Sequence, residues 1–365
     1  MKPAAVPSPG HPIDTLLPRF QHVIDMFLDR QRSTMSEISP DTLPLFDAAV
    51  QLLGAGKRLR PTFCYWGWRA AGGSPDDAGV ITVAAALELF QASALVHDDV
   101  IDDSDTRRGQ PSVHRRFAEQ HRAARWHGSP ESFGAAAAVL LGDLLLGWSD
   151  ELFGSAELGP DALRRGRAVF DLMRTEVGSG QYLDVLEQVS GATRTVGHTE
   201  RARQVIRFKS ARYSVEHPLI IGATVAGLDD QLLSPYRRYG AALGEAFQLR
   251  DDILGVFGDP ARTGKPAGDD LREGKRTVLV ACALERADAA QTRLVNRLLG
   301  DPGLDDEGVE QLRAVLVETE ALRRVETMVA QRVTDAREAL ESAKATDDGR
   351  EALARLIDLA TDRTR

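Results

Sequence analysis

The fold and chemistry of this chain are decided by the stretch Leu95-Val96-His97-Asp98-Asp99-Val100-Ile101-Asp102-Asp103-Ser104-Asp105-Thr106-Arg107-Arg108-Gly109. Five carboxylates fall within eight residues, and two adjacent arginines follow at once. Carboxylates this close repel one another unless a cation lies between them. An apolar run from Val80 to Val96 leads into the cluster. The pattern predicts a buried helix that ends at a charged site.

Asp98 and Asp102 are four residues apart, so on a helix they point to the same side. Mg²⁺ takes hard oxygen ligands, keeps several waters and is usually completed by substrate phosphates. Arginine side chains are forks that match phosphate oxygens. The stretch therefore predicts a diphosphate site bridged by metal. The alternative is a solvated helix end, which is disfavoured because carboxylates at a helix C-terminus oppose the macrodipole.

The composition is that of a globular protein. The chain has 365 residues, of which 43% are hydrophobic and 27% charged. Its net charge of -9 argues against nucleic acid as a partner. With two distant cysteines, Cys64 and Cys282, and no recognisable signal peptide, we expect a cytoplasmic location. The apolar stretch 133–148 is cut by Asp143, so no transmembrane segment is expected.

The rest of the chain has the pattern of helices joined by polar connections. Residues 1–12 are predicted to be a mobile tail and 13–365 a single domain. Ser74-Pro75 and Ser234-Pro235 combine a capping serine with proline, which is typical of helix starts. No sustained period-two alternation indicates a strand or a hairpin. We therefore predict an all-α fold, with long helices at about 74–102, 133–148, 160–188 and 234–255, and one from Thr199 that kinks at Pro218.

Two further charged segments matter. Asp251-Asp252 follows another apolar-rich segment and precedes a loop, 258–276, rich in glycine and charge. Alone, such a pair is more often solvated than functional, but two acidic sites beside basic residues predict facing walls that hold Mg²⁺ and a diphosphate. In the turn Gly56-Lys57-Arg58-Leu59-Arg60, three cations fall within four residues. This turn is either solvated or binds a second anionic group.

In combination, these residues resemble the trans-isoprenyl diphosphate synthases, or polyprenyl synthetases, from about Leu45 to Leu316. The combination is specific, whereas each stretch alone is a weak signal. The resemblance implies an all-α, single-domain bundle around a deep central cavity, a homodimer, three Mg²⁺ ions and prenyltransferase activity. It rests on Gly56-Lys57-Arg58-Leu59-Arg60-Pro61, Asp98 to Gly109, Gly180-Gln181, Phe208-Lys209-Ser210, and Phe247-Gln248-Leu249-Arg250-Asp251-Asp252 with Gly264-Lys265 and Gly274-Lys275-Arg276-Thr277.

The resemblance also implies roles for individual residues. The metal ligands would be Asp98, Asp99, Asp102, Asp251 and Asp252, of which Asp98, Asp102 and Asp251 would be catalytic with Arg107 and Lys209. The third aspartate of the second motif is replaced by Gly255, and we expect activity to survive, with Asp259 or Asp270 contributing through water. The allylic diphosphate would be held by Arg107, Lys209, Gln248 and Lys265, and Ser210 and Lys275 would be further substrate-binding residues. Isopentenyl diphosphate would be held by Lys57, Arg60 and Arg108, and by Gln91, where the family often has His.

The implied reaction is ionisation of an allylic diphosphate followed by attack of the isopentenyl double bond. The growing chain should run down the helix that ends near Asp98, past the small Ser93 and Ala94 to Phe90 and Leu87. Phe90 lies three residues before Ser93, which is roughly 4.5 Å deeper along the helix at 1.5 Å per residue. A small residue above and an aromatic below indicate a product longer than farnesyl, so we expect C20 geranylgeranyl diphosphate. Alternatives are a farnesyl or longer-chain synthase, a non-catalytic subunit of a heteromeric synthase, and a class I terpene cyclase.

Overall fold

The computed structural model describes residues 14–54, 56–190, 193–194, 196–258 and 268–361. The predicted tail, 1–12, lies outside them. Within these residues the fold is all-α apart from one small hairpin, as predicted. The first helices are α1 (Leu17–Ile38), α2 (Leu43–Leu53), α3 (Leu59–Ala70), α4 (Ala78–Ile101), α5 (Val113–Ala124), α6 (Pro130–Gly154) and α7 (Pro160–Ser190). They are followed by α8 (His198–Val205), η2 (Ile206–Glu216), α9 (His217–Val225), α10 (Leu233–Phe257), α12 (Asp269–Arg272), α13 (Val278–Leu284), α14 (Ala289–Leu298), α15 (Asp306–Glu318), α16 (Ala321–Ser342) and α17 (Asp347–Thr361), with 3₁₀ turns η1 (Pro40–Thr42) and η3 (Asp230–Leu232).

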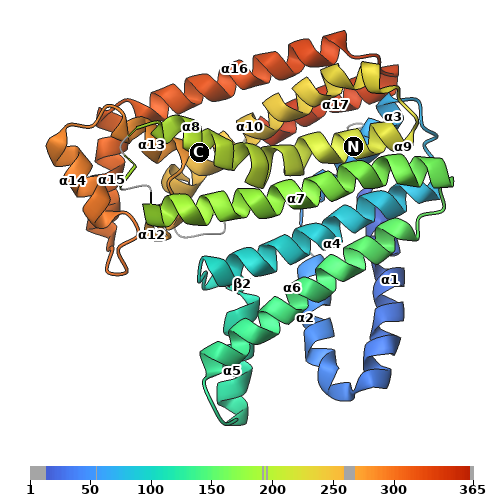
Figure 1. The fold of residues 1–365 in the computed structure, drawn as a ribbon, viewed down its shortest axis with the longest axis horizontal. Helices are drawn as coiled ribbons and strands as arrows, with labels where there is room; N and C mark the ends of the chain where they lie inside the picture. Colours follow the sequence, from blue (N-terminus) through green and yellow to red (C-terminus); the bar gives the residue numbers. More distant parts are fainter. Residues whose placement is uncertain (1–13, 55, 191–192, 195, 259–267, 362–365) are drawn as a thin grey trace, which may run out of the picture.

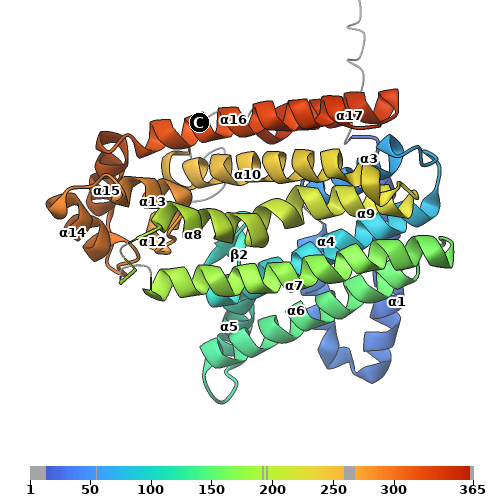
Figure 2. The same cartoon turned by 45° about the horizontal axis from the view of Figure 1, so that its top comes forward.

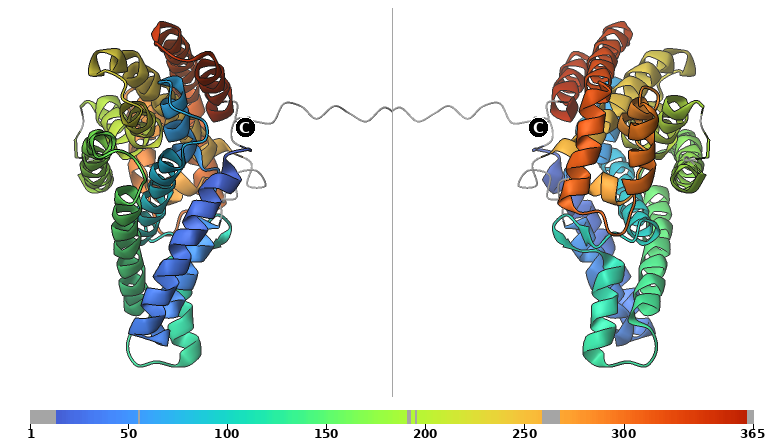
Figure 3. Two further views of the ribbon diagram at one scale, coloured as in Figure 1. Left: turned by 90° about the vertical axis from the view of Figure 1, so that its right-hand side faces the viewer. Right: turned by 90° about the vertical axis from the view of Figure 1, so that its left-hand side faces the viewer.

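The helices are stacked in layers that run roughly parallel to the long axis (Figure 1). In Figure 2, α16 and α17 form one outer layer, followed by α10, then the line of α8, η2 and α9, then α7. The helices α1, α5 and α6 project together on the opposite side, which the end views of Figure 3 show clearly. Packing of α10 on α16 and η2, of α7 on η2, and of α4 on α6 holds these layers together.

The central helix α4 is buried nearly all round, as its apolar sequence predicts. It begins at Ala78, where the side chain of Asp77 accepts a hydrogen bond from the Val80 amide at 3.0 Å. The prediction that Ser74 caps this helix is wrong. The Ser74 carbonyl accepts a hydrogen bond from the Trp68 indole at 2.8 Å, and this ties residue 74 to α3. The helix therefore starts one turn later than the serine-proline pair indicated.

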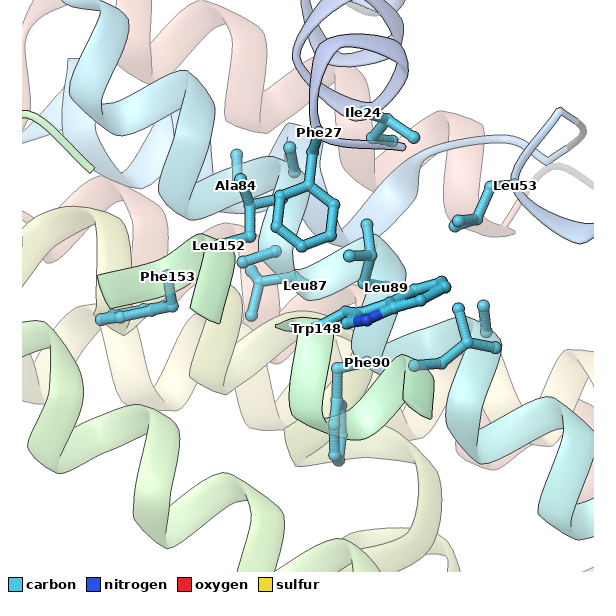
Figure 4. Close-up of a cluster of buried hydrophobic side chains, with 14 of the residues drawn as sticks. Ile24, Phe27, Leu53, Ala84, Leu87, Leu89, Phe90, Trp148, Leu152 and Phe153 are labelled. Carbon is cyan, nitrogen blue, oxygen red and sulfur yellow. The ribbon is translucent and has the colours of Figure 1, made fainter. Parts of the chain in front are cut away.

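The core around α4 is built from α1, α2, α6 and α7. In Figure 4, Leu87 and Leu89 of α4 lie beside Phe27 of α1 and Trp148 of α6. The rings of Phe27 and Trp148 meet edge to face with centroids 6.3 Å apart. Leu87 and Leu89 are fully buried. This packing fixes the helix that ends at Asp98.

A π-helix, η2, replaces the predicted kink at Pro218. It spans Ile206–Glu216, and Pro218 lies in the first turn of the following α9, where proline is tolerated. A π-helix is wider than an α-helix and is often found at functional sites. Neighbouring helices approach it through glycines. A Cβ at Gly180 of α7 would lie 2.4 Å from the backbone nitrogen of Lys209. A Cβ at Gly244 of α10 would lie 2.3 Å from the backbone oxygen of Ala211.

A hairpin that the sequence pattern did not predict follows α4. Strand β1 (Thr106–Arg107) pairs antiparallel with β2 (Gln110–Pro111). Both residues between the strands, Arg108 and Gly109, have positive φ, at 54° and 73°. Such a tight turn has the mirror-image backbone that hairpins favour. Each strand has only two residues, too few for alternation to be visible in the sequence.

Two helices of the described chain, α4 and α6, are long and apolar enough to cross a membrane by length and composition alone. The most apolar window of α4 is 78% buried inside the protein, and that of α6 is 44% buried. Both helices belong to the core cluster, so α4 in particular has the burial of a core helix.

The close approach at Gly180 predicts opposite effects for two neighbouring alanine substitutions. Gly180→Ala should lower the free energy of unfolding by about 1–3 kcal/mol because its methyl group has no room beside η2. Gly178→Ala is the matched control. No atom lies within 4 Å of its added Cβ, so helix propensity should raise stability by about 0.5–1 kcal/mol. Urea unfolding measures both, and equal effects would contradict the packing argument.

Candidate active site

A cavity of about 340 Å³ lies between α4, α7, η2, α10 and the segment 270–277. It collects most of the predicted site residues, although they come from distant parts of the chain. Those that line it are Arg60, Gln91, Ala94, Asp98, Arg107, Lys209, Ser210, Gln248, Asp251, Asp252 and Lys275. Those that do not line it are Lys57, Leu87, Phe90, Ser93, Asp99, Asp102 and Arg108. Lys265 and Asp259 lie outside the described residues.

A larger groove, about 950 Å³, lies on another face of η2, between α10 and α16. Its charged side chains largely pair with one another, as when Arg203 donates to Glu245 at 2.8 Å and Arg332 lies 3.1 Å from Asp335. We place the site in the smaller cavity because carboxylates and cations from several helices converge there.

The first wall of the cavity is the end of α4. Asp98 lies in its last turn, and Asp102 follows as the C-cap, with its amide donating to the Asp98 carbonyl at 2.8 Å. Both Lys209 Nζ and Gln181 Nε2 lie 3.0 Å from Asp98 Oδ1. Burial raises the pKa of Asp98, but Lys209, Lys275 and Arg107 outweigh it and lower that pKa to about 2. Asp98 is therefore a carboxylate at neutral pH.

Asp99 points away from the cavity and holds Arg107. Asp99 is 1% exposed, and Arg107 Nε donates to its Oδ1 at 2.8 Å. A second guanidinium nitrogen of Arg107 also binds Asp99 and lies 3.6 Å from Asp98 Oδ2. Asp99 as a metal ligand stays a prediction. Its ion pair favours the role of orienting Arg107, which lines the cavity.

The second wall is the C-terminal half of α10. Gln248, Asp251 and Asp252 line the cavity from it. Gln248 Nε2 donates to Asp252 Oδ1 at 2.9 Å, whereas Asp252 Oδ2 is buried without a hydrogen-bond partner. Burial raises the pKa of Asp252 well above its ordinary value. Burial thus outweighs the hydrogen bond from Gln248 and the positive charge of Lys275, both of which lower this pKa.

Lys275 joins the end of α4 to the segment 269–276. Its Nζ lies 3.2 Å from Asp102 Oδ2 and 4.0 Å from Asp270 Oδ1, and it also pairs with Glu273. Ser104 Oγ donates to Glu273 at 3.2 Å, which joins the segment after the first motif to the segment 269–276. The end of α4 and this segment are thus connected by one cation and one hydroxyl.

Gly255, where the resemblance implies a third aspartate, makes room for Asp270. A Cβ at Gly255 would lie 1.9 Å from Asp270 Oδ2. The carboxylate of Asp270 therefore occupies the space in which a side chain at residue 255 would begin. Asp270 also lines the cavity with Asp251 and Asp252. A carboxylate is present at this corner of the cavity, supplied by a residue fifteen positions later in the sequence.

The residues present fit a divalent cation shared with a substrate. In the described part of the chain, Asp102 Oδ1 and Asp252 Oδ2 are buried without a hydrogen-bond partner, and Asp102 Oδ2 has only the ion pair with Lys275. Among the described residues, no three ligand side chains are arranged to hold a metal by themselves. Mg²⁺ commonly takes one or two carboxylates and completes its shell with water and phosphate oxygens. This donor set agrees with that mode of binding.

The basic turn reaches the cavity through Arg60. Its guanidinium donates to Ser214 Oγ at 2.6 Å and lies 4.1 Å from the centroid of the Tyr213 ring. The Tyr213 hydroxyl donates to the side-chain oxygen of Gln91, which also lines the cavity. Lys57 and Arg108 are exposed beside this end of the cavity, with the Arg108 guanidinium packed against Gly56.

The predicted chain-length residues fall on two levels. Ala94 lines the cavity. Phe90, one turn deeper, meets the rings of Phe170 and Tyr213 edge to face, with centroids 6.0 and 5.6 Å away. Leu87 belongs to the α1–α6 core (Figure 4). Phe90 and Phe170 thus close the space below Ala94, whereas Leu87 and the buried Ser93 do not line the cavity.

Sequence reasoning missed Asp184 and Tyr213. Asp184 is 9% exposed, and its Oδ2 lies 2.6 Å from Lys209 Nζ, so it holds the lysine that also contacts Asp98. Val177, Gln181 and Asp184 all line the cavity and are spaced by four and three residues on α7. An amide and an acid at that helical spacing were the available signal.

The contact between Gly255 and Asp270 predicts that restoring the aspartate is harmful. Gly255→Asp should lower kcat/KM by about tenfold or more, because the new side chain displaces Asp270 and adds a buried like charge. Gly255→Ala should lower kcat/KM by less, because its methyl group crowds Asp270 but adds no charge. Steady-state kinetics with matched Mg²⁺ measures both, and a more active Gly255→Asp variant would contradict the assignment of this corner to Asp270.

Comparisons with known proteins agree on one family. The sequence profile of the polyprenyl synthetase family matches residues 44–316. A short chain isoprenyl diphosphate synthase from Methanothermobacter thermautotrophicus is 32% identical over 93% of this chain and 96% of its own length. A geranylfarnesyl diphosphate synthase from Aeropyrum pernix is 30% identical over 93% of this chain and its full length. Among solved structures, geranylgeranyl pyrophosphate synthase from Corynebacterium glutamicum, complexed with isoprenyl diphosphate and magnesium, has a TM-score of 0.91 and 38% identity over 96% of this chain and 99% of its own.

Proposed function

Because the chain belongs to the polyprenyl synthetase family and is a prenyltransferase, we propose that it condenses isopentenyl diphosphate with an allylic diphosphate to give linear all-trans geranylgeranyl diphosphate. The observation that carries the proposal is the division of the cavity. The lining includes the carboxylates of α4 and α10 together with Lys209 and Lys275. It also includes Arg60 and Gln91, which both contact Tyr213, and Gln91 lies about two turns before Asp98 on α4. Two separate sets of cationic and polar groups suit two anionic substrates.

The first step of the proposed reaction breaks the allylic C–O bond. Arg107, Lys209 and Lys275 would hold the leaving diphosphate and stabilise its developing charge. Mg²⁺, when bound, would neutralise further charge on the phosphate oxygens. The electron pair of the C–O bond leaves with the diphosphate, so an allylic cation remains. Val177, Leu95 and Phe247, which line the cavity, would keep water from that cation.

The second step joins the two substrates. Arg60 and Gln91, with Lys57 and Arg108 at the exposed end, would hold isopentenyl diphosphate so that its double bond faces the cation. The double bond attacks, a carbon–carbon bond forms, and one proton is lost to the departing diphosphate. No separate base is required, which agrees with the absence of a histidine among the residues that line the described cavity.

We assign the metal ligands to Asp98 and Asp102 on one wall and Asp251 on the other, with Asp270 in place of the missing third aspartate. The number of ions, three, is part of the proposal. Lys275 and Lys209 neutralise part of this carboxylate cluster and would turn to phosphate oxygens as the metal and diphosphate bind. Magnesium in the complex of the Corynebacterium glutamicum enzyme supports this reading.

We also propose a homodimer in the cytoplasm. On α6, Phe133, Val139 and Leu140 are 36%, 42% and 56% exposed, which gives this helix an apolar outer face. A second copy of the chain would cover it, since contiguous exposed apolar surface marks interaction sites. Cys64 and Cys282 are both free and buried, which agrees with a reducing compartment.

The proposed reaction predicts the outcome of one assay. Purified protein with Mg²⁺, isopentenyl diphosphate and C5, C10 or C15 allylic primers should form linear C20 product, detected by chromatography after dephosphorylation. A farnesyl or longer product would correct the chain length alone. Hydrocarbon formed from a single substrate would identify the protein as a cyclase. If no primer gave any product, the protein would be a non-catalytic subunit of a heteromeric synthase. Either of the last two outcomes contradicts the proposal.

Product length should respond to the level that each side chain occupies. Ala94→Phe should shorten the main product, because Ala94 lines the cavity. Ser93→Phe is the comparison; it should also shorten the product, but less, because Ser93 is 2% exposed and outside the lining. Phe90→Ala should lengthen the product by opening the space beside Phe170. Chromatography of the dephosphorylated products measures the chain length. If Ala94→Phe and Phe90→Ala both left the chain length unchanged, α4 would not determine product length.

A further inference from the structure

Arg58 is a buried arginine inside the basic turn, although its neighbours in the sequence face solvent or the cavity. It is 5% exposed, and its Nη1 lies 2.6 Å from Glu88 Oε1. Glu88 is 4% exposed and lies in the middle of α4. A second guanidinium nitrogen of Arg58 donates to Gln21 Oε1 at 2.8 Å and to the Leu53 carbonyl. The proposed mechanism uses neither member of this ion pair.

The backbone at Arg58 is held in an uncommon conformation. Its φ is 51°, in the left-handed region that is unfavourable for a residue with a Cβ. The Arg58 carbonyl accepts a hydrogen bond from Thr62 Oγ1 at 2.7 Å and caps α3. Such a conformation persists when surrounding contacts determine it. Here these contacts are the Glu88 carboxylate and the Leu53 carbonyl, which join the turn to α4 and to the end of α2.

The position of the turn fixes three cationic side chains. Lys57 precedes Arg58, and Arg60, two residues later, reaches Ser214 and Tyr213 in the cavity. Arg108 packs against Gly56 and donates to the Leu52 carbonyl at 3.2 Å. These cations repel one another in the absence of ligand, and Glu88 supplies the nearby negative charge. The charge of Glu88 also attracts Arg108, whereas the charges of Arg58 and Arg60 repel Arg108.

We propose that the buried Arg58–Glu88 ion pair is the positioning element of the isopentenyl diphosphate subsite. It holds the turn so that Lys57, Arg60 and Arg108 converge before substrate arrives. Neither residue touches substrate; each acts through the backbone of the turn. The inference rests on the proposed function, which assigns these three cations to the second diphosphate.

An ordinary stabilising role makes a different prediction. A buried ion pair can often be exchanged for apolar residues of similar volume without loss of stability, whereas removal of one partner leaves a buried charge. Arg58→Met with Glu88→Leu is therefore a variant that keeps the core filled and removes the anchor. If the pair only stabilises the fold, this double variant should keep its substrate affinity.

The test compares KM values in the double variant and in a matched control. We expect KM for isopentenyl diphosphate to rise about tenfold, with KM for the allylic substrate changed by less than about twofold. Leu356→Ala is the control, since this side chain is fully buried in α17, none of whose residues lines the cavity. It should lower the melting temperature and leave both KM values unchanged.

When the double variant folds, two outcomes overturn the inference. One is a folded double variant with wild-type KM for isopentenyl diphosphate. The other is a wild-type enzyme that elongates no primer, which overturns the proposed function and this inference with it. If the double variant does not fold, Glu88→Gln decides, because it keeps the hydrogen bond and removes the charge. A rise of about threefold or more in the same KM supports the anchor, and an unchanged KM overturns it.

Discussion

Carboxylates from the end of α4 and from α10 face one cavity, and their mutual repulsion is the constraint on which the site depends. The cations that relieve it come from other parts of the chain. Lys209 lies 3.0 Å from Asp98, and Lys275 lies 3.2 Å from Asp102. Lys209 is itself held by Asp184 of α7. Asp98 and Asp102 therefore depend on cations from segments distant in sequence, so the first wall of the cavity needs the assembled bundle.

That assembly requires backbones to approach closely around Lys209. The lysine is part of η2, a wide π-helix between α7 and α10. Gly180 and Gly244 remove the side chains that would otherwise hold those helices away from it. The same close packing brings Gln181 and Gln248 to the cavity. Glycine on the neighbouring helices is thus what allows a broad helix to carry a cation between two acidic walls.

The sequence predicted the helices and most of the site, because those features depend on local patterns. The apolar run before Asp98 indicated α4, and Ser234-Pro235 indicated the start of α10. The predicted serine cap of α10 is wrong, because Ser234 lies inside the helix and its N-cap is Leu232, which makes no side-chain cap. Features set by tertiary contact could not be predicted. Ser74 is a residue type that commonly caps helices, but the Trp68 indole of α3 donates a hydrogen bond to the Ser74 carbonyl and holds residue 74 outside α4. The replacement of a side chain at Gly255 by Asp270 depends on a contact across fifteen residues, which no local spacing encodes.

One tyrosine links the two ends of the proposed reaction. The Tyr213 hydroxyl binds Gln91, and its ring supports Arg60, both assigned to isopentenyl diphosphate. The edge of the same ring packs against Phe90, assigned to the floor beneath the growing chain. Tyr213 is buried among these groups, and a dense core transmits a shift rather than absorbing it. The depth of the floor and the geometry of the second diphosphate are therefore not independent. A side chain at residue 90 that lengthens the product also removes a contact behind Arg60, so product length and affinity for isopentenyl diphosphate should change together.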